Sequence, residues 1–207
     1  MLKIIDYGLG NVSAFLNIYK RLGVRIEPAS TASQLEGATR IILPGVGAFD
    51  EAIKALNSSG MRPLLEDLVL HRKTPFLGIC VGMQILAEQS EEGVQPGLGF
   101  IKGTVKRFCN EKRDLKQLPI PHMGWNTLHP KRKHELFSGL SDEPRLYFLH
   151  SYYFECENPE NSLAETEYQQ KYTSVVNREN VIGVQCHPEK SHSAGSTILA
   201  NFSSIST

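Results

Sequence analysis

The stretch from Thr74 to Gln89 constrains the fold more than any other part of this 207-residue chain. Its first half contains a short apolar run, which predicts a buried strand, and it continues with Met83 and Leu86 at helical spacing. Between the two lies Gly78-Ile79-Cys80-Val81-Gly82, the glycine-x-nucleophile-x-glycine pattern of a nucleophile elbow with cysteine in place of serine. The pattern predicts a sharp strand-to-helix turn, because glycines tolerate the crowded backbone that such a turn requires.

A cysteine at the start of a helix feels the positive end of the helix dipole, which favours the thiolate of Cys80. Taken alone, the pattern also fits a buried structural cysteine. The other cysteines, Cys109, Cys156 and Cys186, are interpreted as structural. The four show no paired zinc spacing and are too sparse for a disulfide framework, which favours a reducing cytoplasm.

The overall charge excludes some classes of partner. Lys plus Arg and Asp plus Glu both total 22, so a general nucleic-acid or anionic-membrane binder is not expected. No apolar run approaches a membrane span, and Asp6 interrupts the N-terminal apolar run too early for a signal peptide. The length favours a single domain over residues 1–207.

The first half of the chain alternates strands and helices. This alternation predicts an α/β fold, with a mostly parallel open sheet flanked by helices on both faces and active groups at the carboxyl ends of the strands. The predicted strands and helices, in order, are Leu2–Ile5, Val12–Leu22, Val24–Glu27, Arg40–Leu43, Phe49–Leu56 and Arg62–His71.

After Gln89 strands dominate, which predicts an antiparallel β extension of the same domain. Residues 177–180 have the composition of a hairpin turn, and a last helix is expected over Ala194–Ile205. The strands predicted in this part are Phe100–Phe108, Trp125–Leu128, Arg145–Phe154 and Ser174–Val176.

Two glycine-rich turns raise the question of a cofactor. Gly8-Leu9-Gly10 follows a strand, but Ser13 occupies the third glycine position of a dinucleotide fingerprint. Pro44-Gly45-Val46-Gly47 offers backbone N–H groups for a phosphate or an oxyanion, but it lacks the Lys-Ser/Thr ending of a P-loop. No cofactor is therefore predicted.

A second chemical signal follows the apolar run from Val181 to Cys186. His187-Pro188-Glu189 should project its histidine and its carboxylate to the same side of the chain, because Pro188 favours extended geometry before it. With Cys80 these residues form a candidate Cys-His-Glu triad. The spacing of His187, Glu189 and His192 superficially matches a zinc motif, but Pro188 disfavours the continuous helix that such a motif needs. No metal is therefore expected.

Together these motifs resemble the class I, triad-type glutamine amidotransferases, and more narrowly the glutaminase subunits of imidazole glycerol phosphate synthases. The matching motifs run through nearly the whole chain in family order. They are residues 6–11 (DYGLGN), 44–47 (PGVG), 78–84 (GICVGMQ), 121–126 (PHMGWN), 150–152 (HSY) and 187–191 (HPEKS).

The resemblance implies that Cys80 attacks the side-chain amide of glutamine and forms a thioester. His187 would protonate the departing ammonia and then activate water, and Glu189 would orient His187. The implied oxyanion-binding residues are Gly45, Val46, Gly47 and Val81. Those implied for substrate binding are Gln84 and the main chain of His150, Ser151 and Tyr152.

The resemblance also implies a heterodimer in which ammonia passes through a channel into a separate (β/α)8-barrel cyclase subunit. Asn11, Trp125 and Lys190 would face that partner, and glutaminase activity of the chain alone should be weak. The glycines at 45 and 47 would make it easy to complete the oxyanion hole only when the partner is loaded.

Two positions depart from the family pattern, and three alternatives stay open. Cys186 replaces an aromatic residue, and His192 stands where histidine-pathway members more often have a small or acidic residue. The second departure resembles paralogues that supply ammonia for the amidation of bacterial surface sugars. The remaining alternatives are a stand-alone γ-glutamyl hydrolase or peptidase and a silent binding subunit.

Overall fold

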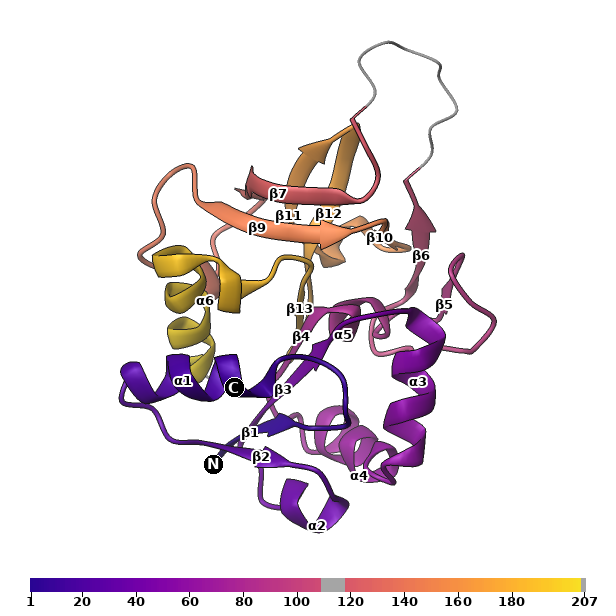
Figure 1. Ribbon diagram of the computed structural model, residues 1–207, viewed down its shortest axis with the longest axis vertical. Coiled ribbons are helices and arrows are strands. Elements are labelled where there is room, and N and C mark those ends of the chain that lie inside the picture. Colours follow the sequence, from indigo (N-terminus) through magenta and orange to yellow (C-terminus); the bar gives the residue numbers. More distant parts are fainter. Residues whose placement is uncertain (109–117, 206–207) are drawn as a thin grey trace.

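The computed structural model describes residues 1–108 and 118–205, and Figure 1 shows their arrangement. Eleven strands of this part form one sheet with the order β2-β1-β3-β4-β13-β12-β10-β6-β5; β11 pairs with β12, and β8 pairs with β11. A separate two-stranded sheet consists of β7 and β9. Cys109 lies outside the described residues.

The elements follow one another in the order anticipated for an α/β fold with a β extension. The strands are β1 Leu2–Ile5, β2 Ile26–Ala29, β3 Arg40–Gly45, β4 Phe76–Cys80, β5 Gln89–Ser90, β6 Gly103–Arg107, β7 His122–Thr127, β8 His129–Pro130, β9 Arg145–His150, β10 Tyr152–Cys156, β11 Ser162–Tyr168, β12 Gln170–Arg178 and β13 Val181–Val184. The helices are α1 Val12–Arg21, α2 Ala32–Leu35, α3 Phe49–Ser58, α4 Arg62–Glu66, α5 Val81–Gln84 and α6 His192–Ser204, with a π-helical turn η1 at Asp67–His71 and 3₁₀ turns η2 Glu135–Phe137, η3 Pro159–Asn161 and η4 Pro188–Lys190.

The parallel half of the sheet comprises β2, β1, β3, β4 and β13, and the strands beyond it pair mainly antiparallel. Figure 1 shows α1 and α6 on one face of the parallel strands, and α3 and α4 on the other. This is the layered α/β arrangement that the alternation of strands and helices predicts.

Helix α1 shows why the local sequence forms these elements. The side chain of Asn11 caps its first turn by accepting the Ala14 N–H at 3.1 Å, and basic residues in the last turn favour the negative end of the helix dipole. Phe15 and Tyr19 are buried against the sheet, and the Tyr19 hydroxyl donates to the Leu199 carbonyl of α6 at 2.9 Å.

Several predicted boundaries differ from those of the structure by two to four residues. For two boundaries the backbone hydrogen bonds explain the difference. The second strand begins at Ile26 and not at Val24, whose N–H instead bonds the carbonyl of Tyr19 and closes the end of α1. Helix α5 ends at Gln84, because the carbonyls of the next residues accept N–H groups from residues 98–101 and not from a further helical turn.

The predicted strand Arg145–Phe154 is divided at Ser151. Its first part, β9, pairs with β7, and its second part, β10, pairs with β6 and β12 in the main sheet. The helix α2 and the strands β5, β8 and β11 were not predicted, and three of these four are only two to four residues long. The hairpin turn at residues 177–180 is confirmed by the antiparallel pairing of Arg178 with Val181.

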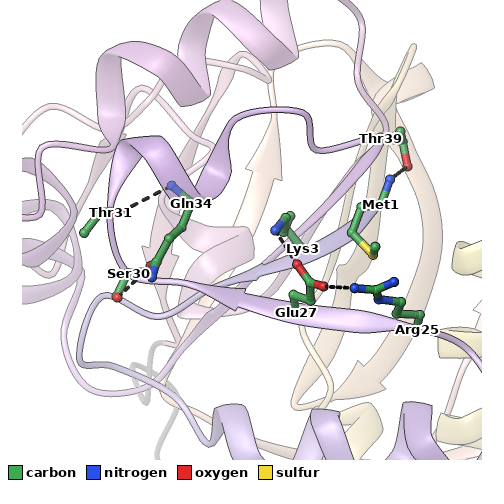
Figure 2. A network of polar contacts seen from close by, with 8 residues as sticks. All are labelled: Met1, Lys3, Arg25, Glu27, Ser30, Thr31, Gln34 and Thr39. Atoms are coloured by element: carbon green, nitrogen blue, oxygen red, sulfur yellow. Dashed lines mark hydrogen bonds and ion pairs between the residues drawn. The ribbon is translucent and has the colours of Figure 1, made fainter.

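An ion-pair network lies at the edge strand β2 of the parallel sheet. Lys3 on β1 donates to Glu27 on β2 at 2.7 Å, and Arg25 donates to the other oxygen of Glu27 at 2.7 Å (Figure 2). Charged groups on an edge strand oppose pairing with another chain. The N-terminal ammonium group also donates to the Thr39 hydroxyl, at 2.6 Å (Figure 2).

Candidate active site

Three parallel strands bring the motifs of the sequence together. Gly45 at the end of β3 lies opposite Cys80 at the end of β4, and Val184 at the end of β13 lies opposite Ile79. The carboxyl ends of neighbouring parallel strands meet at one edge of a sheet, where α/β proteins place their sites. The glycine-rich turn, the elbow and the residues that follow β13 therefore converge.

The elbow holds Cys80 in an unusual backbone conformation. Its φ is 55° and its ψ is −112°, in a region that costs a residue with a side chain on the order of 1–3 kcal/mol. Such strain persists only where the surrounding structure enforces it. The side chain of Cys80 is 4% exposed and lines a cleft.

Close backbone packing explains the glycines around Cys80. A Cβ atom at Gly78 would lie 2.4 Å from the carbonyl oxygen of Gly82. A Cβ atom at Gly82 would lie 2.0 Å from the carbonyl oxygen of Leu43, and one at Gly45 would lie 2.4 Å from the Gly82 nitrogen. No side chain fits at these three positions, so β3, β4 and α5 meet through bare backbone.

His187 and Glu189 lie together after β13. Nδ1 of His187 and Oε1 of Glu189 are 2.8 Å apart, and both side chains are almost fully buried. His187 lines the same cleft as Cys80. The Ser191 hydroxyl donates to the His187 carbonyl at 2.6 Å and accepts the Tyr147 N–H at 2.9 Å, which fixes the main chain that carries the imidazole.

The surroundings of His187 favour its protonated form. Burial alone lowers the pKa of the imidazole, but hydrogen bonds to Cys80 and Glu189 and the charges of both groups outweigh this effect and raise the pKa to about 10. The arrangement thus holds an imidazolium between a sulfur atom and a carboxylate. A proton stored there is available to a departing nitrogen.

The turn after β3 faces the elbow across the cleft. Gly47 has a φ of +90°, which only glycine adopts at little cost, and Val46 is 42% exposed. The Tyr7 hydroxyl donates to the Pro44 carbonyl at 2.8 Å and anchors the start of the turn. The backbone around Val46 and Gly47 is thus poorly covered, while the backbone before it is fixed.

The cleft has a volume of about 290 Å³. The side chain of Gln84 on its wall donates from Nε2 to the Tyr152 carbonyl and to Gln185 Oε1, both at 3.1 Å. The carbonyl of Ser151 accepts the Phe108 N–H at 3.1 Å. The lining residues are Val46, Gly47, Cys80, Val81, Gln84, Glu92, Pro121, Leu149, His150, Ser151, Tyr152, His187 and Lys190.

Residues 3–205 match the family described as "Glutamine amidotransferase class-I". This chain belongs to the class-I glutamine amidotransferase family. Solved structures agree on the fold: a "Crystal structure of glutamine amidotransferase" has a TM-score of 0.74 at 19% identity over 97% of this chain and 96% of the other. The "Structure of PurLQS from Thermotoga maritima" gives 0.73 at 16% identity, covering 98% and 97% of the two chains.

Curated relatives indicate which subgroup of the amidotransferase family this chain resembles most. "Imidazole glycerol phosphate synthase subunit HisH" of Bdellovibrio bacteriovorus is 56% identical over 99% of this chain and all of that protein. The protein of that name from Leptospira borgpetersenii is 46% identical over the same shares. Within the amidotransferase family, this chain therefore groups with the HisH subunits.

The sequence did not indicate Gln185, which lies beside the nucleophile, or Glu92, which lines the cleft. Gln185 is fully buried and its Nε2 lies 3.7 Å from Cys80 Sγ. It precedes His187 by two positions, so the alternation of side chains along a strand could have placed it on the same face. Glu92 accepts the Phe49 N–H at 2.8 Å and lines the cleft, and no sequence signal indicates it.

The three residues predicted to face a partner occupy different positions. Lys190 lines the cleft, with its ammonium group 5.7 Å from the centre of the Tyr147 ring. Trp125 is 38% exposed and stacks on His192, with ring centres 5.1 Å apart and an interplanar angle of 7°. Asn11 caps α1, as described above.

Cys156 and Cys186 do not resemble the elbow cysteine. Cys186 is fully buried, and burial is the largest cause that raises its pKa. Burial likewise raises the pKa of Cys156 to about 11. Thiols in such surroundings are poor nucleophiles. Across residues 1–108 and 118–205 no cluster of three or more His, Cys, Asp or Glu is placed to hold a metal ion, and no helix is long and apolar enough to cross a membrane.

Proposed function

We propose that this chain is the glutaminase subunit of an imidazole glycerol phosphate synthase in histidine biosynthesis. It hydrolyses glutamine to glutamate and ammonia and supplies the ammonia to a cyclase subunit. The observation that carries the proposal is the meeting of Cys80, His187 and Glu189 at the ends of β4 and β13, in a chain 56% identical to a HisH subunit. The proposal places the complex in the cytoplasm.

The first half-reaction forms a thioester. Sγ of Cys80 attacks the side-chain amide carbon of glutamine, and the carbonyl oxygen becomes an oxyanion. The N–H groups of Val81 and of the turn at residues 45–47 bind this oxyanion in the proposed mechanism. His187 passes its proton to the amide nitrogen as the C–N bond breaks, and ammonia leaves.

The second half-reaction restores the enzyme. His187, now neutral at the nitrogen that faces the cleft, takes a proton from water, and the resulting hydroxide attacks the thioester carbon. The C–S bond breaks, glutamate leaves, and the thiolate at Cys80 pairs again with the imidazolium. Glu189 stays ionised throughout and holds the imidazole by its Nδ1–H.

The rest of glutamine is bound beside the junction of β9 and β10. Gln84, His150, Ser151 and Tyr152 line this part of the cleft. The Tyr152 carbonyl already accepts bonds from Gln84 and His150, at 3.1 and 2.7 Å. The Tyr152 carbonyl therefore holds Gln84 and His150 in place, and neighbouring groups of this part of the cleft contact the substrate.

The partner is a (β/α)8-barrel cyclase that covers the mouth of the cleft. Met123 and Trp125 on β7 and Val46 in the oxyanion turn are 64%, 38% and 42% exposed, and the proposal places these apolar side chains against the cyclase. Asn11 and Lys190 complete the proposed interface. Ammonia leaves through this covered mouth, which keeps it from bulk water.

The comparisons do not favour the other functions considered. Relatives named HisH match the chain from end to end, which supports histidine biosynthesis over the amidation of surface sugars. An exposed apolar surface beside the cleft supports a partner-dependent enzyme over a stand-alone hydrolase. The intact set Cys80, His187 and Glu189 supports an enzyme over a silent subunit.

The test is a glutaminase assay of the chain alone and in complex with its cyclase loaded with a substrate analogue. The loaded complex should release glutamate faster than the isolated chain, and diazo-oxo-norleucine should label Cys80. Cys80→Ser should abolish both the label and the activity, and it should leave binding of the cyclase unchanged. A loaded complex of wild-type protein that neither reacts with the label nor releases glutamate would refute the proposal.

A further inference from the structure

Two histidines and a tyrosine form a buried polar cluster that reaches the cleft through His150, and no side chain of this cluster takes part in the bond-making steps above. His122 on β7, His150 on β9 and Tyr172 on β12 are 2%, 6% and 3% exposed. His122 lies between two aromatic rings, with ring centres 3.9 Å from Tyr168 and 4.9 Å from Phe148. The cluster therefore has little room to rearrange, and each polar atom in it needs a partner.

The Tyr172 hydroxyl connects the two histidines. It lies 3.1 Å from Nδ1 of His122 and 3.2 Å from Nε2 of His150. The remaining ring nitrogens are also bonded: Nδ1 of His150 lies 2.7 Å from the Tyr152 carbonyl oxygen, and Nε2 of His122 lies 3.3 Å from Nδ2 of Asn126. The five residues thus form one continuous chain of hydrogen bonds.

The direction of every bond in this chain follows from its two ends. A carbonyl oxygen only accepts, so Nδ1 of His150 carries a proton and donates to Tyr152. Burial lowers the pKa of His150 to about 3 and that of His122 to about 4, so both rings are neutral and each has one acceptor nitrogen. Tyr172 must then donate to Nε2 of His150 and accept from Nδ1 of His122. Asn126, whose amide nitrogen only donates, completes the chain at Nε2 of His122.

The chain ends at the wall of the active-site cleft. The Tyr152 carbonyl that accepts the last proton also accepts Nε2 of Gln84 at 3.1 Å. Gln84 in turn donates to Gln185, whose amide nitrogen lies 3.7 Å from Sγ of Cys80. At the other end, Asn126 directly follows the exposed Trp125. The bonds therefore run from the exposed strand β7 to the residues around the nucleophile.

We propose that Tyr172 is a positioning residue for glutamine hydrolysis, because its hydroxyl joins the exposed strand β7 to the main chain that binds glutamine. This role rests on the proposed function. Tyr172 touches no reacting atom and acts through the carbonyl of Tyr152. Its loss frees the junction of β9 and β10 to shift, which weakens substrate binding in the ground state and the transition state alike.

Tyr172→Phe removes only the hydroxyl and keeps the aromatic packing. In the complex with the cyclase it should raise the KM for glutamine about tenfold, the usual effect of losing one buried neutral hydrogen bond, and leave kcat within about twofold. Tyr168→Phe is the matched control. It removes a hydroxyl from a ring that stacks on His122, but that hydroxyl bonds the Pro119 carbonyl and not the hydrogen-bonded chain, so the KM should stay within about twofold of wild type.

A second measurement needs no variant. Nitrogen-15 spectra of the full chain should show His122 and His150 neutral at pH 7, both with the proton on Nδ1. A merely structural cluster does not require this, because the imidazole of free histidine prefers the proton on Nε2. In Tyr172→Phe the Nδ1 proton of His122 should lose its hydrogen-bonded shift, while that of His150 keeps its bond to Tyr152.

The failures of this role and of the proposed function are distinguishable. Equal KM values for Tyr172→Phe and Tyr168→Phe in an active complex would overturn the role of Tyr172 alone, as would a proton on Nε2 of His150. A wild-type complex that does not hydrolyse glutamine would overturn the function, and with it this role. A fall in kcat at unchanged KM would also contradict positioning through substrate binding.

Discussion

Gly82→Ala tests the idea that the reactive geometry of Cys80 is imposed by bare backbone contact. The added Cβ atom would lie 2.0 Å from the Leu43 carbonyl oxygen and 3.0 Å from the Leu43 carbonyl carbon, both backbone atoms of β3. Contacts of this kind stay beyond 3.0 Å, so α5 and β3 must separate by about 1 Å. No flexible side chain is available to absorb the shift.

The size of the effect follows from that displacement. Overpacking of this order destabilises a protein by about 1–3 kcal/mol, which for a chain of this length lowers Tm by roughly 2–12 °C. The same shift moves the N–H of Val81 and the sulfur of Cys80 relative to the turn at residues 45–47. A misplacement of about 1 Å typically reduces a rate on the order of 100-fold.

The measurement compares kcat/KM for glutamine in the cyclase complex with the rate of Cys80 labelling and with Tm. Gly23→Ala serves as the control. Gly23 has a φ of +69° with open space around it, so alanine there adds backbone strain of about 1 kcal/mol without a steric contact or an effect on the site. If Gly82→Ala kept kcat/KM within twofold of wild type, the glycine at this position would not be required by the elbow, and the reasoning would be refuted.

Three further perturbations follow from the same structure. The pKa of His187 rises from 6.5 to about 10 on folding, so protonation of His187 stabilises the protein below pH 6.5, and this contribution is lost as the pH rises towards 10. Glu189→Gln should flatten the dependence of the free energy of unfolding on pH between these values. The same variant should reduce kcat less than Cys80→Ser does. The pKa of His122 falls to about 4, so the fold loses stability as the pH drops from 6.5 through 4, and His122→Phe should show less of this acid loss in urea titrations. The pair of Lys73 and Glu179 is more than half exposed on both sides, so Lys73→Ala should leave the urea midpoint of unfolding unchanged in the same titrations.

The sequence predicted the structure best where neighbouring residues alone determine the backbone conformation. The strand before the elbow and the alternating α/β pattern depend on periodicity, glycine chemistry and proline geometry, and they were predicted to within a residue or two. The end of helix α5 could not be predicted, because residues 98–101 compete for its carbonyls from a distant part of the chain. The division of the strand at Ser151 likewise depends on which sheet each half joins.

The residues of the candidate site likewise differ in whether neighbouring residues identify them. The motifs identify Cys80 and the pair His187 and Glu189, because each carries its chemistry in consecutive residues. Nothing local distinguishes Tyr172 from any other tyrosine of a strand. Its importance arises only when β12 brings it between two histidines from other strands, and pairing between distant segments is what single-sequence reasoning cannot supply.

The contact between Gly82 and Leu43 also limits how the oxyanion site can change shape. Residues 43–45 are clamped between the elbow and the Tyr7 hydroxyl, so they cannot travel with a moving loop. Any reorientation must be a rotation in place of the peptide units at Val46 and Gly47. Under the proposed function, a cyclase that docks on the exposed Val46 reorients these peptide units alone, and Cys80 keeps its position.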